Sequence, residues 1–140
     1  MTNKTNLKHR KRRDFWVDIQ KQIGKLSAVN QPDAQRVFLQ FRDNGGLQLS
    51  SIYSYVLALR HADKALQGAS FREASPEQCT SIVTYLKNEC APSSAHMFAA
   101  LLRTYWRAML EVDELPFKVE KALSCKRPKA KITGQVIVGE

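Results

Sequence analysis

Residues 49–66 read LSSIYSYVLALRHADKAL and form the most regular stretch of the chain. Apolar residues such as Ile52, Tyr55 and Leu59 recur at steps of three and four, which places them on one face of an α-helix. Gly68 follows shortly afterwards and favours the end of the helix. The stretch therefore predicts an amphipathic helix that buries one face against the rest of the chain.

A second segment repeats this pattern later in the chain. Each copy has a serine, an aromatic residue and a Leu-Arg pair at equal spacing: Ser51, Tyr55, Leu59 and Arg60, then Ser94, Phe98, Leu102 and Arg103. Two copies are too few for a solenoid, which generally needs three or more repeats to close its core. The repeat therefore indicates a duplicated helix pair inside one compact bundle. Ser51 and Ser94 are expected to cap their helices.

Further helices are predicted on both sides of these two. Ser75 to Gln78 read SPEQ, a capping-box signature that predicts a helix beginning at Pro76. Phe98, Tyr105 and Trp106 are expected in the core, and Trp16 is expected to pack the first helix onto the bundle. Alternating strand patterns are too weak to build a sheet, so we predict an all-α, compact orthogonal bundle of four to five helices. Besides the repeat helices, the predicted segments are 14–24, 31–44, 76–88 and 116–123.

Charge is distributed unevenly along the chain. It has 22 lysine and arginine residues against 13 aspartate and glutamate residues, giving a formal charge of +9 and a pI near 9.7. This excess favours polyanionic partners. Half of the basic residues lie in two runs, at 4–13 and 121–131, whereas residues 14–120 hold eleven basic and twelve acidic residues. A binding face on the folded body must therefore come from the arrangement of its charges.

The remaining composition argues against several classes of site. Cys79, Cys90 and Cys125 are odd in number and far apart, so neither a disulfide framework nor a zinc site is expected, and we predict no metal and no cofactor. Residues 1–13 lack the apolar stretch of a secretory signal, and no later segment approaches membrane-spanning length. A cytoplasmic location without a membrane partner is expected.

Four stretches appear in the order of a known family: 38–41 before a glycine turn, 49–60, 75–78 and 102–107. Together they resemble the core-binding, SAM-like N-terminal domain of phage-integrase-type tyrosine recombinases, over roughly residues 31–137. The polar, basic composition of residues 1–11 predicts a flexible arm, which the family motif does not include. The resemblance implies a helical DNA-binding core domain at 12–125. At 126–140 it implies a basic linker and the start of a missing catalytic domain.

The resemblance also implies which chemistry is absent. Such recombinases cleave DNA with a tyrosine nucleophile, assisted by arginine, lysine and histidine residues of the catalytic domain. Neither His61 nor His96 begins a His-x-x-Arg motif. We therefore expect a chain without catalytic residues, a fragment of an enzyme that cleaves and rejoins DNA. The expected partners are duplex DNA, the catalytic domain of the same protein and further protomers in a recombination complex.

In this family the two repeat helices contact the major groove and its flanking backbone. Helical geometry places one acid, Asp63, on the outer face of the first repeat helix and no acid on the second before Glu111. The DNA-binding candidates are Ser50, Tyr53, Ser54, Arg60, His61 and Lys64 on the first helix, Ser93, His96, Arg103, Thr104 and Arg107 on the second, and Lys126, Arg127, Lys129 and Lys131 in the linker.

Other interpretations remain open from sequence alone. Arg60 and Arg103 are equally suited to ion pairs with neighbouring helices, and the two histidines to packing. A helical protein-interaction domain with basic tails is the alternative from another class. An exposed apolar groove, with acids on the outer faces of both repeat helices, would favour it. RNA binding rests only on charge and the basic arm.

Overall fold

The computed structural model describes residues 14–126, which form six α-helices and one 3-10 helix without a strand. The all-α class is confirmed. The structure has one α-helix more than the predicted bundle of four to five, and each of the six predicted helical segments contains an α-helix. The arm at 1–11 and the linker after Lys126 lie outside the described residues. The elements are α2 (Phe15–Ile23), η1 (Ala28–Asn30), α3 (Gln31–Asp43), α4 (Leu49–Ala65), α5 (Pro76–Glu89), α6 (Pro92–Leu110) and α7 (Phe117–Ala122).

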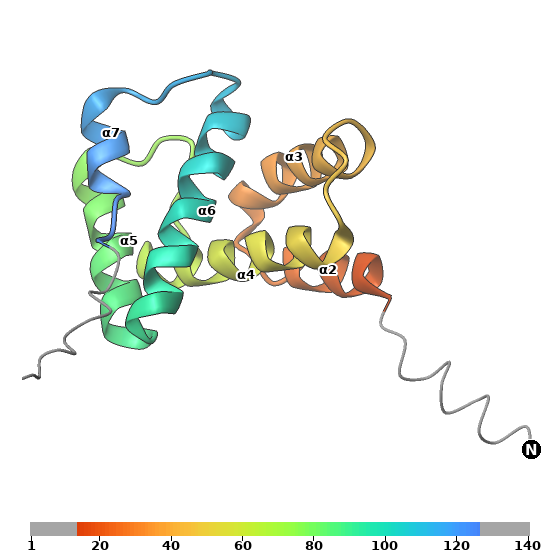
Figure 1. Cartoon of the computed structure of the whole chain (residues 1–140), viewed down its shortest axis with the longest axis horizontal. Helices are drawn as coiled ribbons and strands as arrows, with labels where there is room; N and C mark the ends of the chain where they lie inside the picture. The colour runs from red at the N-terminus through yellow and green to blue at the C-terminus, as the bar shows by residue number, and fades with distance from the viewer. Residues whose placement is uncertain (1–13, 127–140) are drawn as a thin grey trace, which may run out of the picture.

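The two repeat helices, α4 and α6, cross at the centre of the bundle (Figure 1). Helix α3 packs on both of them, and α5 packs on both from another side. Helix α2 runs beside α4 in the same direction, because Phe15 contacts Tyr53 at one end and Gln22 bonds to Arg60 near the other. Helix α7 packs on α5. The short helix α2 thus packs directly on the repeat helix α4. The short helix α7 packs on α5, which in turn packs on the repeat helix α6.

Large aromatic side chains fill the core. Tyr105 and Trp106 are buried as predicted, and Phe71 packs on the Trp106 ring with 5.3 Å between ring centroids. Burying one such side chain contributes about 1.5–3 kcal/mol. Phe98, also expected in the core, is only half-buried. Trp16 packs against the core as expected, and the guanidinium of Arg42 covers its ring at 4.3 Å.

Of three predicted helix caps, the structure confirms one and contradicts two. Ser75 and Gln78 form the expected capping box: Gln78 N donates to Ser75 Oγ at 3.1 Å, and Ser75 N donates to Gln78 Oε1 at 2.9 Å. The predicted caps Ser51 and Ser94 instead lie inside the first turns of α4 and α6, whose cap residues are Gln48 and Ala91. Helix α6 begins early because Pro92 has a φ suited to the first helical position. Helix α4 begins at Leu49, which packs against the core.

A buried polar network joins the segment between α2 and α3 to the end of α4. Asn30 is 2% exposed, and its Nδ2 donates to Ser27 Oγ, Asp63 Oδ1 and the Ala69 carbonyl at 3.0–3.1 Å. Its Oδ1 accepts from Phe71 N at 2.8 Å. The Asn30 amide therefore forms hydrogen bonds with polar groups from three parts of the chain. Leaving any of these groups without a partner in the interior would cost free energy.

A second polar cluster holds the C-terminal end of α6. Arg36 and Arg72 both donate to the Met109 carbonyl at 2.9 Å, and both pair with Asp33. Cations are favourable at this end of a helix, where carbonyl groups lack partners within the helix. The hydrogen bond from Arg72 is the main reason that the pKa of Asp33 is lowered from its ordinary value. This cluster fixes α6 against α3 and the loop before α5.

We expect replacement of Asn30 to destabilise the fold strongly. Asn30→Ala leaves Phe71 N without its acceptor and should lower the free energy of unfolding by about 3 kcal/mol. Asn30→Asp keeps an acceptor but places a second carboxylate beside Asp63, so at pH 7 it should cost more than alanine. Urea denaturation measures both, and Asn88→Ala, at an exposed asparagine, is the matched control. A loss below about 0.5 kcal/mol for Asn30→Ala, within the range of ordinary surface substitutions, would contradict this role.

Candidate nucleic-acid interface

The solvent-facing side of α4 has no exposed acid. Ser50 and Lys64 are exposed, and Ser54, Leu57 and His61 are half-buried along the same side of the helix. Asp63 was expected on this face, and that expectation was wrong. Its carboxylate accepts hydrogen bonds from Ser27 N at 3.1 Å, from Ser27 Oγ at 2.9 Å and from Asn30 Nδ2 at 3.1 Å. The outer side of α4 therefore carries only neutral and cationic groups.

Two candidates on α4 lie at the edge that meets α2. Arg60 donates through one guanidinium nitrogen to Gln22 Oε1, and Tyr53 packs on Phe15 with 5.8 Å between ring centroids. Both side chains are half-buried. Arg60 thus has a structural role in holding α2. A guanidinium has five N–H donors, so this bond leaves others for a second acceptor.

The His61 side chain packs against aromatic rings and a cysteine and is only partly exposed to solvent. Its ring lies 6.1 Å from that of Tyr85 and 5.1 Å from that of Phe98, and Nε2 is 3.9 Å from Cys90 Sγ. Burial lowers the pKa of His61, and the charges of Lys64 and Arg60 lower it further, while Glu89 opposes them. The imidazole is therefore neutral at neutral pH and adds no positive charge to the face.

Two arginines of the predicted basic face of α6 are paired with α7 and with the residue that follows it. Arg103 donates to the Leu123 carbonyl at 2.9 Å and lies 3.6 Å from Glu120 Oε2. Arg107 lies 3.5 Å from Glu120 Oε1 and donates to Thr104 Oγ1 at 3.2 Å. As expected, α6 itself carries no acid before Glu111, but α7 brings Glu120 beside both arginines. Arg103 takes the ion-pair role that sequence analysis left open.

His96 of α6 also contacts the segment that follows α7. Its Nδ1 lies 2.8 Å from the Cys125 carbonyl oxygen, just after α7, and its side chain is half-buried. Helix α6 still presents Ser93 and Met97 to solvent, the latter 44% exposed. The fully exposed residues of α6 are therefore uncharged, whereas α4 exposes Lys64.

Two exposed lysines, one on α2, the helix that packs beside α4, and one just after it, were missed as candidates from sequence alone. Lys21 lies on α2 one residue before Gln22, the partner of Arg60, and Lys25 follows the end of the same helix. Their position depends on the docking of α2 along α4, which the sequence did not predict. In the linker, Lys126 is exposed, whereas Arg127, Lys129 and Lys131 lie outside the described residues.

Other kinds of site find little support in residues 14–126. No group of three or more potential metal-ligating side chains occurs there, and the three cysteines are free. Burial raises the pKa of Cys79 to about 11, and that of Cys90 is also raised, so neither thiol is activated. Within this described part, no helix has the length and apolar character needed to cross a membrane.

Comparisons with known proteins give no match: no family model, curated protein or solved structure is similar to this chain.

We expect the packing of His61 to make stability depend on pH. Because the folded pKa lies below the ordinary value of 6.5, the unfolded chain takes up the proton first as pH falls. This contribution to stability is full above pH 6.5 and decreases as pH falls toward the folded pKa. Urea denaturation at pH 7.5, 6.5 and 5.5 should give a flatter dependence for His61→Gln than for the wild type. Equal slopes for the two proteins would contradict the assignment.

Proposed function

We propose that this chain binds duplex DNA through the outer side of α4 and the adjoining lysines of α2. The observation that carries the proposal is the inward orientation of Asp63, which leaves α4 without an exposed acid. The order of motifs that resembles a tyrosine recombinase core-binding domain supports DNA as the polyanion. In this proposal the chain clamps DNA for site-specific recombination and integration, while cleavage belongs to a separate catalytic domain.

Backbone phosphates are the groups that this face is best suited to contact. Lys64 and Lys21 are exposed and have no carboxylate partner among residues 14–126. Ser50 lies in the first turn of α4, where backbone N–H groups also lack partners within the helix. Such contacts position a protein on DNA without reading its sequence. Base reading would fall to the less polar middle of the face, at Ser54 and Leu57.

Helix α6 has a smaller part in this proposal than the resemblance implied. Arg103 and Arg107 share Glu120, so a phosphate would have to compete with an existing ion pair. Ser93 and Thr104 remain polar candidates on this helix. The basic linker would add contacts along the DNA backbone, and further protomers would assemble on the same DNA in the cytoplasm. Alone, the chain should bind weakly, because it would form only half of a clamp.

One observation supports the alternative function, a protein-interaction domain, and another argues against it. A groove with an apolar floor lies between α5 and α7. The acids that would also have been expected on the outer sides of both repeat helices are absent, because α6 contains none and Asp63 of α4 points inward. DNA binding at α4 is therefore the better-supported function, and the groove is a separate surface.

Removing two cations from the proposed face should weaken DNA binding and its dependence on salt. Each neutralised phosphate contributes about 0.9 to the slope of log K against log salt, so Lys21→Ala/Lys64→Ala should reduce that slope by about 2. Affinity at low salt should fall about tenfold or more. Fluorescence anisotropy with a labelled duplex, from 50 to 200 mM salt, measures both quantities.

The matched control removes the same charge elsewhere. Lys118→Ala/Lys121→Ala changes two exposed lysines of α7 and should leave the slope and the affinity nearly unchanged. Thermal melting by circular dichroism verifies that both double variants stay folded. Equal losses in the two variants would mean that binding depends only on net charge. No loss in either would move the site to the basic ends of the chain.

A further inference from the structure

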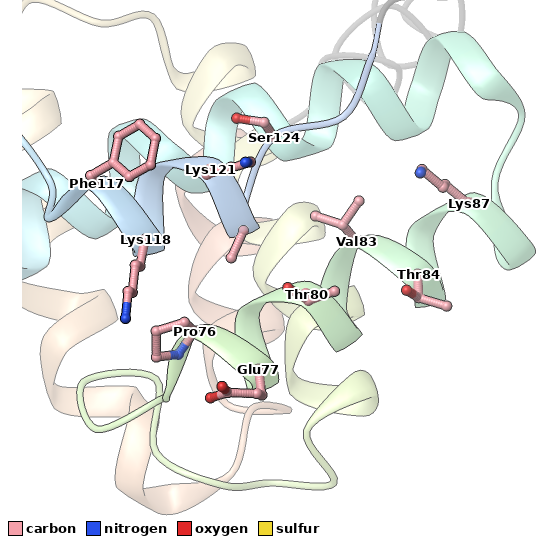
Figure 2. Close-up of a pocket in the computed structure, with 11 residues that line it drawn as sticks. Pro76, Glu77, Thr80, Val83, Thr84, Lys87, Phe117, Lys118, Lys121 and Ser124 are labelled. Carbon is pink, nitrogen blue, oxygen red and sulfur yellow. The ribbon is translucent and has the colours of Figure 1, made fainter.

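A groove of about 570 Å³, open to solvent, lies between helices α5 and α7. Figure 2 shows its two walls, with Pro76, Thr80 and Lys87 along α5 and Phe117 and Lys121 on α7. None of these residues was a sequence-based site candidate. The groove is separate from the outer side of α4, since no residue of α4 lines it.

The floor of the groove is apolar. Val83 contributes from α5 and Ala122 from α7, and both pack against the hydrophobic core. Phe117 forms part of the wall and is 76% exposed, the most exposed of the large apolar side chains in the described chain. A phenyl ring left in water at this level has a hydrophobic surface that a partner side chain can cover.

The rim of the groove is basic. Lys87, Lys118 and Lys121 line it, and none of them has a carboxylate within ion-pair distance among residues 14–126. Lys121 Nζ lies 5.9 Å from the centroid of the Phe117 ring, so cation and aromatic ring occupy one site. Glu77 is the one acid that lines this groove. An apolar floor with three cations above it is complementary to a ligand with apolar anchors and acidic flanks.

These features favour a peptide over a nucleic-acid strand. An apolar floor contributes nothing to binding a phosphate backbone, and one aromatic ring is fewer than the successive stacking platforms typical of single-strand binders.

We propose that the groove between α5 and α7 binds an acidic peptide segment of a partner protein, with an apolar side chain packed on Phe117 and Val83. Its carboxylates pair with Lys87, Lys118 and Lys121. The groove runs from Pro76 to Lys87 along α5, about 16 Å at 1.5 Å per helical residue. This length accommodates about three turns of an amphipathic helix or about five extended residues. The inference goes beyond DNA binding and does not depend on it.

The test is selection from a phage-displayed library of random 12-residue peptides. The library is panned in parallel against the wild type and against Phe117→Ser/Lys118→Glu/Lys121→Glu, all three at exposed positions. We expect the wild type to enrich peptides rich in Asp and Glu with one or two large apolar residues, and the variant to lose at least tenfold of that enrichment. No enrichment, enrichment of basic peptides, or equal enrichment on the variant would overturn the proposal.

The most enriched peptide is then synthesised with a fluorescent label and titrated by anisotropy. Lys118→Glu/Lys121→Glu and Phe117→Ser should each weaken it at least tenfold, whereas Lys21→Ala/Lys64→Ala should leave its affinity unchanged. That last variant separates this proposal from the DNA-binding proposal, because it removes only the face on α4 and α2. Oligothymidylate of 12 nucleotides is the competitor. Displacement of the peptide by oligothymidylate, in a manner that depends on Phe117, would identify a nucleic-acid site and overturn the assignment to peptide.

Discussion

The carboxylate of Asp63 connects the fold of this chain to its proposed surface. By accepting three hydrogen bonds from Ser27 and Asn30, it fixes the connection between α2 and α3 against the end of α4. The same orientation removes the one acid of α4 from the solvent-facing side. Without this network, α2 would lose a main attachment near its end, and the cations of α4 would lie beside an exposed negative charge. Stability and electrostatics thus depend on one side chain.

The two Leu-Arg pairs of the repeat share a structural role. Arg60 on α4 bonds to Gln22 of α2, and Arg103 on α6 bonds to the Leu123 carbonyl at the end of α7. Each repeat arginine therefore holds a short helix against the bundle. The surroundings of the two differ in charge, because α7 brings Glu120 to Arg103 whereas the acceptor on α2 is a neutral amide. As a result both arginines of α6 share Glu120, whereas neither Arg60 nor Lys64 of α4 pairs with a carboxylate among residues 14–126.

Local sequence patterns predicted most of the fold. The spacing of Ile52, Tyr55 and Leu59 and the capping box at Ser75 depend only on residues close in the chain, so the helices and the buried face of α4 were predicted correctly. The site was predicted less well, because its properties come from contacts between distant segments. The inward orientation of Asp63 depends on its hydrogen bonds with Ser27 and Asn30. The ion pairs of Arg103 and Arg107 depend on Glu120 of α7. The groove between α5 and α7 likewise exists only after those helices pack.

The proposed function requires duplex DNA to contact the outer side of α4. Titration of the ¹⁵N-labelled chain with a short duplex, followed by two-dimensional NMR, tests it residue by residue. Amide signals of Ser50, Ser54 and Lys64 are expected to shift together with those of Lys21 and Lys25, while signals of α7 stay in place. Shifts confined to α5 and α7, or to the residues before Asp14 and after Lys126, would contradict it.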